Sequence, residues 1–217
     1  TKDDIKFILE LFNSNKLIET KKEIEKQIIK FPNSSVLLNI LGAILVDQNQ
    51  FDEAIKKYEK AIKIDPNYAQ VYNNLGIALH HLNKMDEAID NYRKAITLKI
   101  NFVEALNNLA NAFQDLGNKK EALDNFQKVI KIKPNYAEVY NNLGMIFSDL
   151  TRFDDALLSY NKAIKLKPDY DKAYNNLGNL LNDLGKYDEA VSAYHQAIKV
   201  KPNNTKAYSN KVYTRYL

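Results

Sequence analysis

The stretch of residues 174–178, which reads YNNLG, decides the fold because it returns along the chain at a fixed interval. The same letters stand at 140–144 and 72–76, and a close variant, LNNLA, stands at 106–110, so the interval is 34 residues. An internal period of this size indicates a repeat architecture, in which short units bury their apolar faces against one another. Such an array presents a long surface instead of one deep pocket, so the stretch bears on function as well as on fold.

The 34-residue period divides the 217-residue chain without any insertion or deletion. A proline near the end of most units keeps the register visible: Pro32, Pro66, Pro134, Pro168 and Pro202. We predict six units and a tail, with the bounds 1–34, 35–68, 69–102, 103–136, 137–170, 171–204 and 205–217.

The apolar spacing inside a unit predicts two helices. In unit 171–204 the first run follows the helical spacing i, i+3, i+4, i+7 and consists of Tyr174, Leu177, Gly178 and Leu181. The second run also lies on one helical face and consists of Tyr187, Ala190, Val191, Tyr194, Ala197 and Ile198. Between the runs stand residues that tolerate a left-handed backbone, at Gly185 and equivalently at Gly117, Asn49 and Asn83. The predicted fold is therefore all-α.

Each unit has one small residue in its first helix and one aromatic residue in its second. The small residues are Gly42, Gly76, Ala110, Gly144 and Gly178. The aromatic residues are Tyr58, Tyr92, Phe126, Tyr160 and Tyr194. Because helices approach closely only where the facing side chains are small, we predict tight helix pairs. We expect the aromatic rings to be part of the core and to fill the gap to the neighbouring unit.

This arrangement resembles the tetratricopeptide repeat (TPR) family in its period, its small and aromatic positions and its closing proline. The resemblance is strong over residues 35–204. It implies a right-handed superhelix, an α-solenoid, of about six helix-turn-helix units followed by a C-terminal helix. Unit 1–34 has Ile8, Thr20 and Gln27 where small residues are expected, so we interpret it as a degenerate capping repeat.

Three residues in the third and fourth units depart from the pattern. Ile100 replaces the proline, Lys119 stands where an apolar residue opens the second helix, and Val129 replaces an alanine. We predict looser packing around these two units.

The tail 205–217 begins like another first helix, with Tyr208 in the aromatic place, but it has Lys211 and Arg215 at apolar offsets. Two interpretations stay open, a polar capping helix and a truncated next repeat. The chain begins with Thr1 and not with an initiator methionine, so a longer natural protein also stays open.

In the TPR family the first helices line a concave face that binds extended peptides, and the resemblance implies such a groove here. The predicted groove residues are Asn73, Asn74, Asn107, Asn108, Asn111, Asn141, Asn142, Asn175, Asn176, Asn179, Asp115, Asp149 and Asp183. Each carboxamide offers two donors and an acceptor, so a column of asparagines can pair with a peptide main chain whatever its side chains are. The asparagine pairs look like those in the TPR region of O-linked N-acetylglucosamine transferases, which holds protein substrates by their main chain.

The asparagines also have a purely structural interpretation. Asparagine is common at these positions in TPR proteins, and some of the amides could tie neighbouring helices together. We favour peptide binding for the second asparagine of each pair, such as Asn74 and Asn176, and leave the role of the first open.

Charge narrows the class of partner. The net charge is +4, but the predicted first helices of units two to five contain no lysine or arginine, and the sixth contains only Lys172. We therefore expect a neutral to acidic groove. A TPR carboxylate clamp for chaperone tails needs basic first helices, and nucleic-acid binding needs a basic stripe with exposed aromatic residues, so we expect neither.

Composition gives no sign of a catalytic or metal-binding site. The chain has no cysteine and three histidines, of which His80 and His81 are adjacent on a helix and cannot share a metal ion. We expect no metal, no cofactor and no catalytic site. No apolar run is long enough to cross a bilayer, and the lack of cysteine fits a reducing compartment, so we expect a cytoplasmic protein without membrane insertion.

The sequence thus predicts a non-catalytic scaffold that binds extended segments of protein partners in an asparagine-rich groove. One alternative is the substrate-presenting TPR arm of a larger enzyme, such as an O-glycosyltransferase or another transferase. A second is a self-assembly scaffold, a homo-oligomer in which the terminal helix of one chain docks on another.

Overall fold

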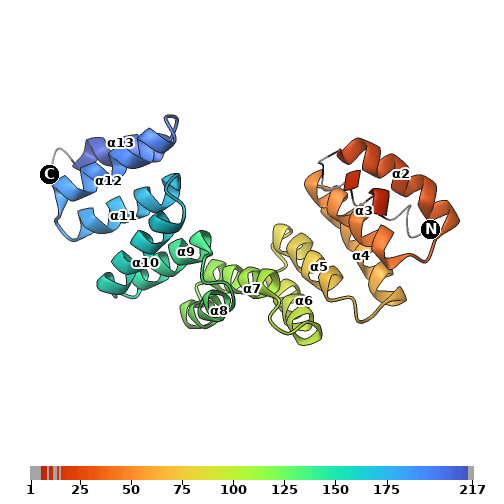
Figure 1. Cartoon of the computed structure of the whole chain (residues 1–217). Helices are drawn as coiled ribbons and strands as arrows, with labels where there is room; N and C mark the ends of the chain where they lie inside the picture. Colours follow the sequence, from red (N-terminus) through yellow and green to blue (C-terminus); the bar gives the residue numbers. More distant parts are fainter. Residues whose placement is uncertain (1–5, 9, 12–13, 15, 215–217) are drawn as a thin grey trace. The chain divides into compact units, whose positions relative to one another are not determined.

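The computed structural model describes residues 6–8, 10–11, 14 and 16–214. Over these residues it forms helices joined by short turns, without any strand (Figure 1). The chain divides into two compact units, Thr1–Leu116 and Gly117–Leu217, which we call the N-unit and the C-unit. The N-unit holds α2 (Leu17–Lys30), α3 (Ser35–Asp47), α4 (Phe51–Ile64), α5 (Ala69–His81), α6 (Met85–Leu98) and α7 (Val103–Asp115). The C-unit holds α8 (Lys119–Ile132), α9 (Ala137–Asp149), α10 (Phe153–Leu166), α11 (Asp171–Asp183), α12 (Tyr187–Val200) and α13 (Thr205–Thr214).

Consecutive helices pack side by side within each unit. In the C-unit, α9 packs on α10 and α11 packs on α12, while α9, α11 and α13 also contact one another in a row. In the N-unit, α3, α5 and α7 form the equivalent row. The predicted all-α solenoid of helix-turn-helix pairs is therefore confirmed, and the rows of first helices are where a groove can lie.

The turn inside each helix pair is closed by one residue with a left-handed backbone. The φ angles are 59° at Asn49, 60° at Asn83, 75° at Gly117 and 72° at Gly185, as expected from the sequence. The following amide then bonds back into the first helix; for example, Lys186 N–H donates to the Leu181 carbonyl at 2.9 Å. Thr151 occupies the same position with φ 57°, an angle that a β-branched residue rarely adopts, and the sequence analysis missed it.

The small and aromatic positions meet inside one helix pair. A Cβ atom added to Gly144 or Gly178 would lie 2.5 Å from Cε1 of Tyr160 or Tyr194, so the ring lies directly against the glycine backbone. The predicted burial of the aromatic residues is confirmed, with Tyr194 only 2% exposed. Each tyrosine covers the glycine of its own repeat, and Tyr194 also belongs to a cluster against which Leu157 of the preceding repeat packs.

Short side chains also join one repeat to the next. Ala137 and Ala163 pack with Tyr170 and Ala173 in one buried cluster, so the end of one repeat and the start of the next share a core. In the N-unit, Phe102 takes the place of Tyr170 in an equivalent cluster.

The second helices end at the same place with or without proline. α6 ends at Leu98, two residues before Ile100, just as α10 ends at Leu166, two residues before Pro168. Ile100 is 83% exposed, while Val129 is fully buried. The looser packing predicted for the third and fourth units stays a prediction.

The two ends of the array differ from the middle. In α2, Thr20 and Gln27 are buried in the places where alanine was expected, and the Thr20 hydroxyl donates to the Lys16 carbonyl at 2.7 Å. In α13, Tyr208 and Val212 are about half exposed. Arg215 lies outside the described residues.

Candidate functional site

The first asparagine of each pair is at least partly buried. Asn73 is 2% exposed and Asn141 is 4% exposed, and Asn39 in α3 is 8% exposed. Asn107 and Asn175 are half-buried. An amide can be buried this deeply only if its polar atoms are hydrogen-bonded.

At three places the second asparagine of a pair supplies that bond from the following repeat. Its Nδ2 donates to the Oδ1 of the first asparagine in the preceding repeat, which stands 35 residues earlier: Asn74 to Asn39 at 2.9 Å, Asn108 to Asn73 at 3.0 Å, and Asn176 to Asn141 at 3.0 Å. Asn210 in α13 continues the series with a bond to Asn175 at 3.3 Å. Asparagines therefore do tie neighbouring first helices together, and we call this series the amide ladder.

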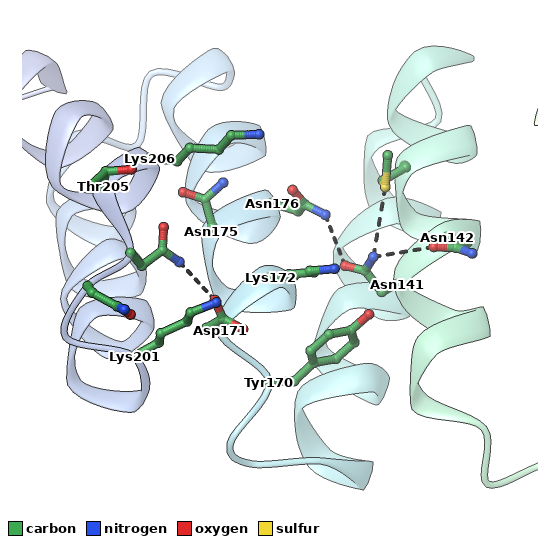
Figure 2. Close-up of a pocket in the computed structure, with 13 residues that line it drawn as sticks. Asn141, Asn142, Tyr170, Asp171, Lys172, Asn175, Asn176, Lys201, Thr205 and Lys206 are labelled. Carbon is green, nitrogen blue, oxygen red and sulfur yellow. Dashed lines mark hydrogen bonds between the residues drawn. The ribbon is translucent and has the colours of Figure 1, made fainter. Parts of the chain in front are cut away.

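The ladder leaves two polar atoms of the α11 pair available to a ligand. Asn175 accepts a bond through Oδ1, and Asn176 donates one through Nδ2 to Asn141. Among the described residues, the Nδ2 of Asn175 and the Oδ1 of Asn176 have no bonded partner. Both side chains line the same cavity (Figure 2), so it is lined by a donor and an acceptor on neighbouring residues.

This cavity is the first of three that adjoin one another along α9, α11 and α13. The first has a volume of about 580 Å³, and its lining includes Asn141, Asn142, Asn175 and Asn176. The second, of about 370 Å³, shares Asn175 and Asn176 with the first. The third, of about 330 Å³, shares Asn179 and Asn210 with the second. We call the three together the C-unit groove.

The charge of the groove differs from the sequence-based expectation. The first cavity is lined by Lys172, Lys201 and Lys206, with Asp171 as the single acidic residue among its lining residues. The expectation of a neutral to acidic groove is therefore wrong for this part. That expectation counted only the first helices of units two to six, whereas Lys201 comes from a loop and Lys206 from the tail helix.

The three predicted groove aspartates lie at or beside the C-terminal ends of first helices, and two of them are engaged by other side chains. Asp115 Oδ2 lies 2.9 Å from Nε2 of His80, and Asp149 Oδ2 lies 3.4 Å from Nζ of Lys119. Asp183 lines the third cavity. Sequence analysis missed both pairs, because each joins residues of different helices.

Asn179 is also engaged by neighbouring side chains. Its Oδ1 accepts bonds from the Tyr194 hydroxyl and from Nδ2 of Asn210, both at 2.9 Å. Burial raises the pKa of the Tyr194 hydroxyl. Asn107, Asn108 and Asn111 lie on α7 of the N-unit. Asn210 was not predicted as a site residue, although it stands one period after Asn176 and could have been found from that spacing.

Within the described part of the chain, no group of three or more histidine, aspartate or glutamate side chains could hold a metal ion. In the same residues, no helix is both long enough and apolar enough to cross a membrane.

Comparison with known families recovers the repeat. A model described as "Tetratricopeptide repeat" matches residues 69–102, 103–136 and 171–204. A second model, described as "TPR repeat", matches residues 42–83 and 144–185. No curated protein sequence matches the chain.

Several solved structures are similar to this one. The crystal structure of MamA is 28% identical, with a TM-score of 0.68, and the match covers 79% of this chain and 94% of that one. YrrB, described as a TPR protein with an unusual peptide-binding site, is 21% identical, with a TM-score of 0.70, and the match covers 89% of this chain and 98% of that one. PilF from Pseudomonas aeruginosa is 18% identical, with a TM-score of 0.85, and the match covers 98% of this chain and 96% of that one. At these identities the likeness to YrrB and PilF shows the fold alone.

Proposed function

The chain belongs to the tetratricopeptide repeat family, since the two repeat models together match well over half of it, and we propose on this premise that it is a non-catalytic scaffold that binds an extended segment of a partner protein in the C-unit groove. The partner segment lies across α9, α11 and α13 and is held mainly through its main chain. YrrB, which has the same fold, is described as having a peptide-binding site, and this supports an interaction role.

One observation carries the proposal. The Nδ2 of Asn175 and the Oδ1 of Asn176 line the first cavity without a partner among the described residues. A peptide unit carries one acceptor and one donor, so these two atoms can satisfy its C=O and N–H together. Recognition of this kind is indifferent to the side chains of the partner.

The ladder explains how the site is held ready. The bonds from Asn176 to Asn141 and from Asn210 to Asn175 fix the orientation of both amides before any ligand arrives. A fixed amide loses little conformational freedom on binding, so more of its hydrogen-bond energy appears as affinity.

The alternative of a substrate-presenting arm rests on the likeness of the asparagine pairs to those of O-linked N-acetylglucosamine transferases. It uses the same groove and differs only in what else the natural protein contains. Sequencing the natural reading frame beyond Leu217 separates the two proposals, because the arm requires a catalytic domain in the same protein.

Binding can be tested with a blocked decapeptide of alternating alanine and serine, titrated into the ¹⁵N-labelled protein. We expect shifts in the side-chain amide signals of Asn175 and Asn176 and none at Asn161, which is exposed on α10. The same peptide with N-methyl groups on alternate residues should bind more weakly, because its main chain has lost donors. Equal binding of both peptides would remove the main chain from the mechanism.

Asn175→Ala is the sharper variant, because it removes the unpartnered donor while Asn210 keeps its second bond, to Asn179. We expect a fivefold to tenfold loss of affinity, about 1 kcal/mol, with little change in stability. The matched control, Asn161→Ala, should change neither quantity. An unchanged affinity for Asn175→Ala would contradict the proposal.

A further inference from the structure

We propose that the lysine end of the C-unit groove is an anion subsite, which takes an acidic side chain of the bound segment against Lys172, Lys201 and Lys206. The inference rests on the peptide-binding role proposed above and names the kind of segment that fits. A glutamate or aspartate carboxylate and a phosphorylated serine or threonine share the chemistry required, an oxyanion on a peptide side chain.

The three lysines come from three different places in the chain and line one cavity. Lys172 lies in the first turn of α11, Lys201 follows the end of α12, and Lys206 lies in the first turn of α13 (Figure 2). All three line the same volume of about 580 Å³. None of them forms an ion pair within the part of the chain that the structure describes.

Asp171 is the acidic residue of this cavity, and it is already engaged. Nδ2 of Asn204 donates to Oδ2 of Asp171 at 3.0 Å. One carboxylate against three ammonium groups leaves the cavity with a net positive charge. A ligand anion entering it would meet attraction from several sides.

In the preceding repeat, the lysine equivalent to Lys201 is neutralised by an ion pair. Lys167 stands one period before Lys201, and its Nζ bonds to Oε1 of Glu138 at 3.0 Å. Glu138 stands one period before Lys172. The repeat 171–204 thus has a second lysine where its neighbour has the neutralising carboxylate.

The ionisation of the neighbouring pair reflects that neutralisation. Partial burial alone would raise the pKa of the Glu138 carboxyl, but the hydrogen bond and charge of Lys167 outweigh it, so the pKa lies below its ordinary value. The hydrogen bond from Glu138 in turn raises the pKa of Lys167. At the equivalent place in the next repeat, Lys201 has no carboxylate bonded to it among the described residues, and a ligand can supply one.

The two repeats also differ in the aromatic residue next to this lysine. Nζ of Lys167 lies 5.0 Å from the ring centre of Tyr170, whose own burial raises its pKa to about 12. One period later the aromatic residue is replaced by Asn204. Lys201 therefore has no equivalent aromatic ring to contact, and its side chain lines the cavity.

Three blocked decapeptides of alanine and serine test the subsite, with glutamate, glutamine or phosphoserine at one central position. We expect the glutamate peptide to bind about tenfold more tightly than the glutamine peptide at low salt. This preference should shrink at about 0.5 M salt, because screening weakens exposed charge pairs. Phosphoserine bound much more tightly than glutamate would identify a phosphorylated segment as the source of the anion.

Lys172→Glu is the matching variant, because it copies the carboxylate that neutralises Lys167 in the preceding repeat. We expect it to remove the preference for glutamate, measured as the ratio of the affinities of the glutamate and glutamine peptides for the same variant. Lys165→Glu, an equal charge change at an exposed position of α10, should leave the preference intact.

The outcomes separate the two proposals. If the glutamine peptide binds and the glutamate peptide binds no more tightly, the subsite is wrong and main-chain recognition stands. If neither peptide binds, main-chain recognition in the groove is wrong, and the subsite falls with it.

Discussion

The consecutive repeats 137–170 and 171–204 are built alike and present different surfaces. Each has a first helix of 13 residues and a second of 14, and each packs a tyrosine against a glycine. They differ at the second residue of the first helix, where Glu138 becomes Lys172, and at the last residue of the repeat, where Tyr170 becomes Asn204.

The comparison teaches that packing and recognition use separate positions of one repeat. The packing positions are apolar or small and recur because two helices must fit together. The ends of the first helices face the groove and can change charge without disturbing that fit. Two substitutions are enough to turn a neutralised lysine into one available to a ligand.

The shared packing predicts the largest effect. Gly144→Val and Gly178→Val should each cost about 3 kcal/mol of unfolding free energy, because the new side chain would meet a buried tyrosine ring. Urea unfolding measures this, and Ser192→Val on the exposed side of α12 is the control. If one glycine tolerates valine and the other does not, the two repeats are not packed alike.

The amide ladder predicts a smaller loss of unfolding free energy, which should differ between a buried rung and a half-buried one. Asn141→Leu should cost about 2 kcal/mol, because it leaves the donor of Asn176 without its acceptor at a 4% exposed site. Asn175→Leu, at the half-buried equivalent position, should cost less than half as much. Equal losses in thermal or urea unfolding would mean that burial does not distinguish the rungs.

The turns predict the smallest change in unfolding free energy, and one of the turn variants should stabilise the chain. Thr151 holds a left-handed backbone at the position that Gly185 occupies in the next repeat and Asn83 occupies in α5–α6. Thr151→Asn should therefore stabilise the chain by about 0.5–1 kcal/mol, and Gly185→Thr should destabilise it by a similar amount. A loss of stability in Thr151→Asn would show that the threonine makes a contact worth more than the strain.

The repeat pattern made most of the fold predictable. Glycines, tyrosines and turn asparagines recur because each satisfies a local steric demand, and such demands can be read from one sequence. Thr151 escaped prediction because threonine is not typical of a left-handed turn; only the geometry of the equivalent turns imposes that angle there.

The candidate site was less predictable because it depends on which helices meet. The sequence placed asparagines on the first helices but could not show that their amides bond across 35 residues. Lys201 and Lys206 were not predicted as site residues, and only the fold brings them beside Lys172.

The amide ladder has a consequence for how this protein can change length. Each rung joins an asparagine to another 35 residues earlier, so α5 carries the acceptor of one rung and the donor of another, through Asn73 and Asn74, and α11 does the same through Asn175 and Asn176. Duplicating or deleting a whole repeat restores the register and keeps every amide opposite another. An insertion inside a first helix would instead turn its asparagines out of this register and leave a buried amide without its partner, so within these helices the ladder favours changes by whole repeats.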